Sequence, residues 1–393
     1  MINENKSYVY LYRHENYDDI EIKSSLIDIL SSTHVIEKIE NSNTRLSIFI
    51  KLNLVGPFSP NQAITTNPHV LDLILEILKE KDINNILDIT VGDNPAVREE
   101  IFTMKKTGIY DIVKKHNVNI MDASKISKIT CPDYKLYRDF EVSTEMIDAD
   151  IFINLPKVKT HTLAYITVAQ KNLFGLIYGL DKSAWHAKAS NPLDFAKAFN
   201  DLYLAFLNAR KDKLTLHIAD GIEGLEGDGP STGGIKKEGK FIIASLDAIS
   251  LDRVSIEILK LDYNKSILTL EAAKRNIGEA NLKNIIINND LNNFSDIKFK
   301  EPNNSMPNIG LRFLKIKFVK SMLFEHPKAD SEKCIKCGEC YKICPPKAIT
   351  FEKGKVPKIN RTKCIRCWCC SEVCPKNAMG KTKRPLVGRI FLR

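Results

Sequence analysis

The sequence predicts an α/β protein in which helices cover a mostly parallel sheet, followed by a second, smaller domain that is rich in cysteine. Two observations carry this prediction. Apolar strand-like segments alternate with amphipathic helical segments between residues 7 and 288, a pattern typical of parallel strands with helices on both faces. Near the C-terminus this alternation stops, and eight cysteines appear in two copies of one spacing.

The large domain is expected to span residues 1–310, with residues 311–328 as a basic connector. Strands are expected at residues 7–12, 46–55, 85–91, 117–122, 149–154, 213–219, 240–246 and 284–288. Helices are expected at 18–31, 96–106, 164–178, 192–210 and 247–260, and after Asn67 and Pro68, which suit the N-cap and first position of a helix. In open sheets of this kind, ligands bind outside the carboxyl ends of the strands.

The cysteines define the small domain, expected at residues 329–380 with a basic tail at 381–393. One run contains Cys334, Cys337, Cys340 and Cys344, and the other contains Cys364, Cys367, Cys370 and Cys374. Each run reads C-x2-C-x2-C-x3-C-P, which holds [4Fe–4S] clusters in bacterial two-cluster ferredoxins. The sequence therefore predicts a small α+β domain of this ferredoxin-like type with two [4Fe–4S] clusters.

In such ferredoxins the fourth cysteine of each run binds the other cluster. Cluster one is then expected to take Cys334, Cys337, Cys340 and Cys374, and cluster two Cys364, Cys367, Cys370 and Cys344. Residues 349–359, with Gly354 at the turn, predict a short hairpin between the runs. Paired zinc sites are one alternative, but they do not require the proline after each fourth cysteine. A disulfide framework is the other, but the sequence shows no secretory context. Cys369 aligns with Glu339 in the repeat and is not expected to be a ligand.

The positive charge of the chain is concentrated at its C-terminal end. Residues 311–393 contain 21 Lys and Arg against 6 Asp and Glu. This asymmetry favours an acidic redox partner, such as a ferredoxin or reductase, over an anionic lipid surface. Nothing in this region resembles a nucleic-acid-binding module, and packing on the domains is favoured over membrane contact for the connector and tail. No signal peptide or membrane span is apparent, so a reducing cytoplasm is expected, and exposed clusters favour an anaerobic lifestyle.

A cluster of basic residues follows the strand at 149–154. Lys157, Lys159, His161 and Lys171 could bind a carboxylate or phosphate, with His161 and Lys171 in catalytic roles, and Lys182 and His186 follow further along. The alternative is a solvated basic loop and an amphipathic helix, with His161 as a cap.

A glycine-rich acidic stretch follows the strand at 213–219. Asp220, Glu226 and Asp228 could bind a divalent cation or substrate hydroxyl groups, because the glycines allow close backbone approach. The alternative is a flexible surface loop. The stretch has the spacing of neither a P-loop nor a dinucleotide-binding loop.

Several of these segments resemble one family. Residues 154–161 (NLPKVKTH), 171–175 (KNLFG) and 220–230 (DGIEGLEGDGP) resemble the signature of domain of unknown function family 362, as do residues 50–55 (IKLNLV) and 65–68 (TTNP). The resemblance covers about residues 45–290. It implies an α/β fold, often with a ferredoxin-like tail, and supports the basic and acidic residues above as one site without assigning their roles.

Three functions are compatible with the sequence. The leading hypothesis is an iron–sulfur oxidoreductase that passes electrons through two clusters to an anionic substrate or partner at the large domain. The second is an electron-transfer subunit without catalysis of its own. The third is a non-redox enzyme whose clusters are structural or sense oxygen.

Overall fold

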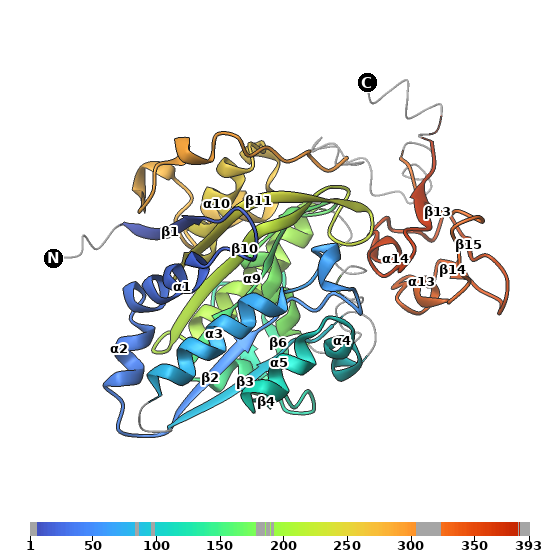
Figure 1. The fold of residues 1–393 in the computed structure, drawn as a ribbon. Coiled ribbons are helices and arrows are strands. Elements are labelled where there is room, and N and C mark those ends of the chain that lie inside the picture. The colour runs from blue at the N-terminus through green and yellow to red at the C-terminus, as the bar shows by residue number, and fades with distance from the viewer. Residues whose placement is uncertain are drawn as a thin grey trace.

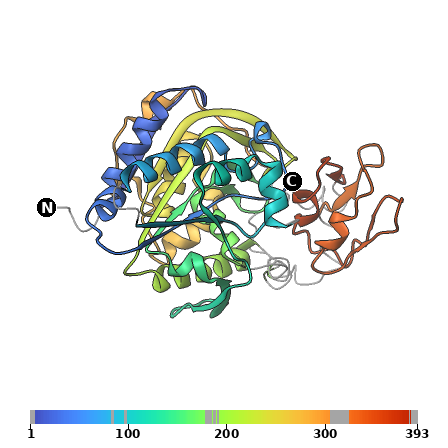
Figure 2. The same ribbon diagram turned by 60° about the horizontal axis from the view of Figure 1, so that its bottom comes forward.

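The structure is a computed structural model that describes residues 6–82, 86–95, 99–177, 185, 189, 192–303, 324–383 and 385. We call the described residues up to 303 the α/β unit and residues 324–383 the cysteine-rich unit. Figures 1 and 2 show the cysteine-rich unit at one side of the α/β unit, opposite the beginning of the first strand.

A ten-stranded sheet forms the centre of the α/β unit. The strands are β1 (Ser7–Arg13), β2 (Leu46–Lys51), β3 (Leu87–Gly92), β4 (Asn119–Ile120), β7 (Ile151–Asn154), β8 (Lys157–His161), β9 (Tyr165–Thr167), β10 (Leu214–Gly227), β11 (Gly234–Ser245) and β12 (Ile285–Ile287). The order is β12-β1-β11-β10-β7-β2-β3-β4, and β8 pairs with both β10 and β9. Only the β1–β11, β10–β11 and β8–β9 pairs of this sheet are antiparallel. The predicted mostly parallel sheet is therefore confirmed.

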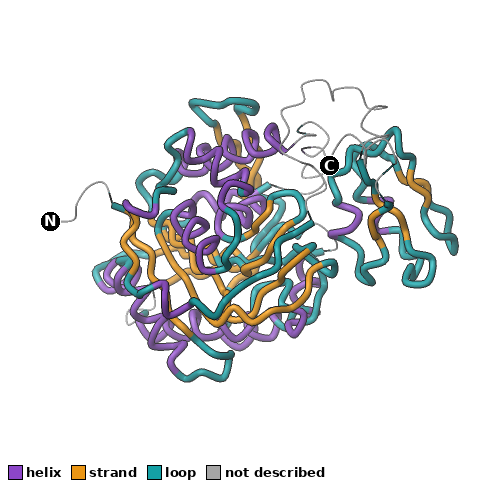
Figure 3. The backbone as a smooth tube through the Cα atoms, turned by 90° about the horizontal axis from the view of Figure 1, so that it is seen from above, coloured by secondary structure: helices purple, strands orange, loops and turns teal. Residues whose placement is uncertain are grey.

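Helices cover both faces of the sheet, as Figure 3 shows. One face packs against α1 (Glu21–Ser32), α2 (Val35–Glu40), α3 (Pro68–Lys81), α4 (Glu100–Lys106) and α5 (Ile109–His116). The other packs against α9 (Pro192–Ala209), α10 (Ala248–Ile258) and α11 (Ile267–Lys274). Alternate strand residues supply the two cores, with Ile48 and Ile50 on one side and Phe49 on the other. Burial on both faces explains why the strands are apolar throughout.

Shorter elements complete the α/β unit. They are β5 (Ile126–Thr130), β6 (Asp139–Ser143), α6 (Thr144–Asp148), α7 (Ala169–Asn172), η1 (Pro60–Gln62), η2 (Leu173–Leu176), η3 (Tyr263–Lys265), η4 (Leu282–Asn284) and η5 (Leu291–Phe294). The predicted start of α3 is confirmed, because the Asn67 side chain accepts a hydrogen bond of 2.8 Å from the backbone of His69. No described helix is long and apolar enough to cross a membrane.

Two local predictions are wrong. Residues 164–178 do not form one helix, because Tyr165–Thr167 pairs with β8 as β9. The buried Asp252 carboxylate then accepts hydrogen bonds from the backbone N–H groups of Ala169 and Gln170, which fixes the start of α7 there. Pairing with the preceding strand and the contact with distant Asp252 have thus overridden the helical spacing of the apolar residues.

The glycine-rich stretch from Asp220 to Gly227 is also not a loop, because β10 continues through it and pairs with β11 and β8. A Cβ on Gly224 would lie 2.4 Å from the carbonyl oxygen of Val158. This glycine is required because the backbones of β8 and β10 approach so closely.

The cysteine-rich unit has internal pseudo-symmetry. It contains β13 (Pro327–Ala329), α13 (Glu339–Lys342), β14 (Ile349–Thr350), β15 (Lys358–Ile359), α14 (Cys369–Glu372) and β16 (Met379–Lys381). The two helices start 30 residues apart, at the same position of each cysteine run. The predicted hairpin is confirmed by the antiparallel pairing of Ile349 with Ile359. Most of the expected connector and basic tail, like Lys182 and His186, lies outside the described residues.

Candidate functional site

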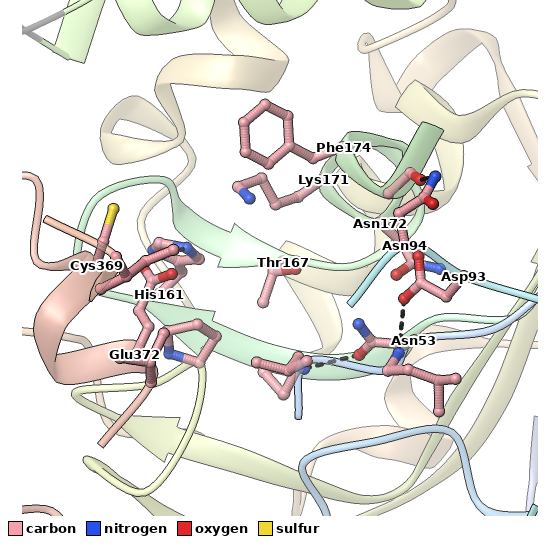
Figure 4. A pocket seen from close by; sticks show the side chains of 17 residues that line it. Asn53, Asp93, Asn94, His161, Thr167, Lys171, Asn172, Phe174, Cys369 and Glu372 are labelled. Carbon is pink, nitrogen blue, oxygen red and sulfur yellow. Dashed lines mark hydrogen bonds and ion pairs between the residues drawn. The ribbon is translucent and has the colours of Figure 1, made fainter. Parts of the chain in front are cut away.

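A cavity of about 100 Å³ lies between the α/β unit and α14 (Figure 4). It opens at the carboxyl ends of β2 and β3, the position expected for a ligand site in such a sheet. The α/β unit contributes Asn53, Leu54, Val55, Asp93, Asn94, Lys159, His161, Thr167, Lys171, Asn172, Phe174, Gly175 and Pro230. The cysteine-rich unit contributes Ile343, Cys369, Glu372 and Val373. The sequence-predicted residues Lys159, His161 and Lys171 therefore come together here.

Lys171 presents a cation to this cavity. Its amine lies 4.6 Å from the centre of the Phe174 ring and 5.8 Å from that of Phe199, and no carboxylate in the described part of the chain forms an ion pair with it. Burial lowers the pKa of Lys171. In Figure 4 its amine points toward His161 and Cys369. A partly buried cation that lies beside aromatic rings and forms no ion pair with a described carboxylate is suited to bind an anion.

Lys159 is a second buried amine in the cavity wall. Its Nζ donates hydrogen bonds of 2.7 Å to Asn53 Oδ1 and 2.7 Å to the carbonyl oxygen of Ile64. Both acceptors are neutral. Burial, together with the nearby positive charge of Lys171, lowers the pKa of Lys159 to about 7. The Asn53 side chain therefore orients this amine without fixing its charge.

Lys157 and Asp220 do not reach the cavity but form a closed ion pair. Lys157 Nζ lies 2.8 Å from Asp220 Oδ2, and both side chains are 1% exposed. The Tyr17 hydroxyl group also donates to the Asp220 carboxylate, at 2.9 Å and 3.0 Å from its two oxygens. The pair lies where β8 and β10 come together, so it links the two strands. Their proposed substrate-binding role has no support in this geometry.

His161 connects the two walls of the cavity. Its Nδ1 accepts hydrogen bonds from the backbone N–H groups of Leu163 and Ala164, at 3.0 Å and 3.2 Å. The proton of the neutral ring is therefore on Nε2. Nε2 lies 3.5 Å from Glu372 Oε1, across the boundary between the units. His161 thus caps backbone groups, as the alternative interpretation expected, and also directs an N–H group toward Glu372.

A buried ion pair supports the floor of the cavity. Lys51 Nζ lies 2.9 Å from Asp93 Oδ1, and Asp93 Oδ2 accepts a hydrogen bond of 2.7 Å from the backbone of Leu54. A Cβ on Gly175 would lie 2.1 Å from Asp93 Oδ1 and 2.4 Å from Lys51 Nζ. The glycine of the KNLFG segment is therefore required because the chain crosses directly over this pair.

The acidic residues of the β10–β11 hairpin do not converge on a cation. Glu226 accepts a hydrogen bond from the backbone of Lys300, and Asp228 contacts Asn303 and Lys381. Among the described residues, no three carboxylates or imidazoles come close enough to hold a single metal ion. The divalent cation remains a prediction without geometric support.

The tip of this hairpin instead holds the cysteine-rich unit. The hydroxyl groups of Ser231 and Thr232 each donate a hydrogen bond of 2.7 Å, to the carbonyl oxygens of Glu372 and Cys374 respectively. Lys381 lies 3.3 Å from Asp228 in the same contact. These contacts fix α14 against the cavity.

The eight cysteines line two small cavities inside the cysteine-rich unit. One is lined by Cys334, Cys337, Cys340 and Cys374, and the other by Cys344, Cys364, Cys367 and Cys370. These groups are the two crossed ligand sets expected from the spacing. The backbone N–H groups of Ala348 and Ala378 donate to the sulfurs of Cys344 and Cys374, both at 3.2 Å. Four convergent sulfurs with amide donors fit a [4Fe–4S] cluster in each cavity.

The two halves of the repeat differ where they face the α/β unit. Glu339 and Lys342 of the first half correspond to Cys369 and Glu372 of the second. Of these four residues, Cys369 and Glu372 line the cavity between the two units. On the first half, Cys337 is exposed. Sequence reasoning did not select Glu372, although this break in the repeat was visible. It also did not select Asn53, Asp93 or Asn94, although these residues directly follow apolar strands.

The two family models that the chain matches agree with this architecture. The chain matches a domain of unknown function, DUF362, over residues 48–257, and a 4Fe-4S dicluster domain over residues 333–378. Thylakoid-associated protein sll1697 of Synechocystis sp. is 28% identical over 267 residues, covering 68% of this chain and 78% of that protein. The lactate racemase apoprotein of Thermoanaerobacterium thermosaccharolyticum aligns with a TM-score of 0.37 and 14% identity, over 61% of this chain and 55% of that one. The match at residues 333–378 includes all eight cysteines of the two runs.

Proposed function

We propose that this chain, which belongs to the DUF362 family and carries a 4Fe-4S dicluster domain, is an oxidoreductase that transfers electrons to a small anionic substrate. The substrate is placed in the cavity between the two units. One observation carries the proposal: this cavity has Lys171 on one wall and α14, which contains Cys370, on the other.

The cluster ligands are assigned to the crossed sets. Cluster one takes Cys334, Cys337, Cys340 and Cys374, and cluster two takes Cys364, Cys367, Cys370 and Cys344. Two bound [4Fe–4S] clusters supply one-electron transfer. Cys369 lines the cavity beside the ligand Cys370, so the substrate is placed next to the side of the unit that holds cluster two.

The residues of the α/β unit bind and orient the substrate. Lys171 supplies the positive charge for a carboxylate or phosphate group. Asn53 and Asn172 present amide groups in the wall, and Phe174 excludes water beside the amine. His161 directs its Nε2–H group into the same space and can donate a hydrogen bond to the oxygen of the substrate.

An acidic protein is the proposed electron donor. The excess of 21 Lys and Arg over 6 Asp and Glu in residues 311–393 favours such a partner, and exposed Cys337 gives it access near cluster one. Electrostatic docking of this kind predicts that the rate of reduction by an acidic ferredoxin falls as the salt concentration rises.

The cluster assignment is tested by anaerobic purification, iron and sulfide analysis and EPR spectroscopy of the reduced protein. Wild type should hold two coupled cubanes. Cys344→Ser should perturb the cluster held by Cys364, Cys367 and Cys370, although Cys344 belongs to the other run. Perturbation of the cluster held by Cys334, Cys337 and Cys340 instead would contradict the crossed sets.

Electron transfer to the cavity is tested with the reduced, cluster-loaded protein. The protein is mixed with pyruvate, oxaloacetate or crotonate, and return of the visible cluster absorption is followed. We expect at least one of these anions to oxidise wild type, and Lys171→Gln to slow this oxidation about tenfold or more with its EPR spectrum unchanged. Lys211→Gln, at an exposed lysine, is the matched control. Equal rates in all variants would favour the electron-transfer subunit without catalysis.

A further inference from the structure

We infer that Lys159 is a nucleophilic amine that forms an imine with a small anionic carbonyl compound, such as a 2-keto acid, bound in the cavity. This inference rests on the proposed function for its anion site and adds a substrate class and a covalent step.

The hydrogen bonds of Lys159 are suited to a neutral amine. Two N–H groups are directed to Asn53 Oδ1 and to the carbonyl oxygen of Ile64, each at 2.7 Å. An amine with two N–H bonds donated to acceptors and one bond to its own carbon keeps its lone pair in the remaining tetrahedral direction. An ammonium group would instead need a third acceptor. The amine is therefore fixed by neutral oxygens, which orient it without requiring that it be charged.

Four charged groups lie around Lys159, and they come from different parts of the fold. Lys171 of α7 and Lys157 of the same strand disfavour a proton on its amine, whereas Asp93 and Glu372 favour one. Asp93 is already paired with Lys51 at 2.9 Å. Burial adds to the effect of the two lysines, because the Lys159 side chain is fully enclosed. A substantial fraction of the amine is therefore uncharged at neutral pH, and the uncharged amine is the form that reacts with carbonyls.

The second lysine defines the substrate class. Lys171 lines the same cavity and forms no ion pair with a described carboxylate, although Glu372 in the opposite wall is close enough to favour its charge. A molecule that carries both a carbonyl and a carboxylate group can contact both amines, with the carboxylate on Lys171 and the carbonyl carbon at Lys159. A cavity of about 100 Å³ limits such a molecule to a few heavy atoms.

The proposed step is a condensation without oxidation or reduction. The Lys159 nitrogen adds to the carbonyl carbon, the carbonyl oxygen leaves as water with the two amine protons, and a C=N bond replaces the C=O bond. His161 can donate a hydrogen bond from Nε2 to the departing oxygen, whose two protons come from the amine. The protonated imine is more electron-deficient than the free ketone, so it is a better electron acceptor.

The experiment is trapping with cyanoborohydride. Purified full-length protein is incubated with pyruvate and cyanoborohydride at neutral pH, and the modified lysines are identified by peptide mass spectrometry. We expect one reduced pyruvate adduct on Lys159, with little modification of surface lysines. Acetone, which has the carbonyl but no carboxylate, should label Lys159 at least about tenfold less. No electron transfer through the clusters is needed, so this result is independent of the oxidation assay.

Three variants make the test specific. Lys159→Met should abolish the adduct. Asn53→Asp places a carboxylate of nearly the same shape beside Lys159, favours its charged form and should strongly reduce labelling while the lysine remains. Lys171→Gln should reduce labelling by pyruvate but not by acetone. An adduct on Lys171 instead, or equal labelling in Asn53→Asp and wild type, would overturn the inference whether or not Lys159→Met folds.

Discussion

Lys157 and Lys159 lie two residues apart on β8, yet they belong to regions with opposite properties. Lys157 is neutralised by Asp220 at 2.8 Å, in a closed pair that joins β8 to β10. Among the described residues, the Lys159 amine donates hydrogen bonds to neutral oxygens alone, and it lines a cavity that it shares with Lys171. The difference shows that one strand can place the same residue type once in a closed ion pair and once in a cavity wall. The counter-ion, supplied by a distant segment, decides which.

The largest effect is expected when the closed pair is broken. Asp220→Asn leaves the Lys157 charge buried without its partner, so the free energy of unfolding should fall by about 3–5 kcal/mol. Anaerobic urea unfolding measures this change. Glu226→Gln is the matched control on the same hairpin, and its loss should not exceed about 1.5 kcal/mol, since Glu226 accepts a backbone hydrogen bond near the surface. Equal losses would show that the pair is not the stabilising feature.

A smaller loss of stability is expected at the floor of the cavity. Gly175→Ala introduces a Cβ that would lie 2.1 Å from Asp93 Oδ1, so the Lys51–Asp93 pair must separate. The free energy of unfolding should fall by about 1–3 kcal/mol, as in overpacked cores. The control is Gly380→Ala, whose nearest neighbour would lie at 3.9 Å. A larger loss in the control would contradict the assignment.

The two regions should also differ in pH dependence. Because the pKa of Lys159 lies at about 7 and that of an unfolded lysine at 10.5, the folded protein binds one proton fewer between these pH values. The stability of wild type relative to Lys159→Met should therefore rise with pH by up to about 1.4 kcal/mol per unit, and fall as the pH drops toward 7. Wild type and Lys159→Met both keep the other charged groups around this position, which are Lys157, Lys171, Asp93 and Glu372. Parallel stability curves from pH 7 to 10 would show that Lys159 stays charged.

The smallest effect on stability is expected at Lys171. Lys171→Met removes a partly buried cation that forms no ion pair with a described carboxylate, so stability should be unchanged or slightly higher. Affinity for oxalate, measured by calorimetry as an unreactive dianion, should nevertheless fall about tenfold or more. This separation of binding from stability is the sharpest contrast with Asp220→Asn. A large loss of stability would show that Lys171, like Lys157, contributes mainly to stability.

The local patterns of the sequence predict much of this fold but only part of the site. Asn67 and Pro68 identify the start of α3, and the cysteine spacing identifies the repeat, because both signals are contained in a few adjacent residues. Lys159, His161 and Lys171 were selected correctly as neighbours, since they follow one strand. The sequence assigns Asp220 and Lys157 to binding. It does not reveal their ion pair, because that pair forms only where β8 lies beside β10. The glycines near Asp220 suggest a loop in sequence, but close strand packing requires them.

The hydrogen bonds from Ser231 and Thr232 to α14 have a consequence for how the protein can be divided. Such small polar contacts do not by themselves hold two separate proteins together at low concentration. Covalent connection raises the effective concentration of one unit at the other to about the millimolar range, so a weak contact stays formed. The cavity has one wall from each unit, and its enclosure is therefore a property of the continuous chain. Two separately expressed halves should close it only when mixed at high concentration.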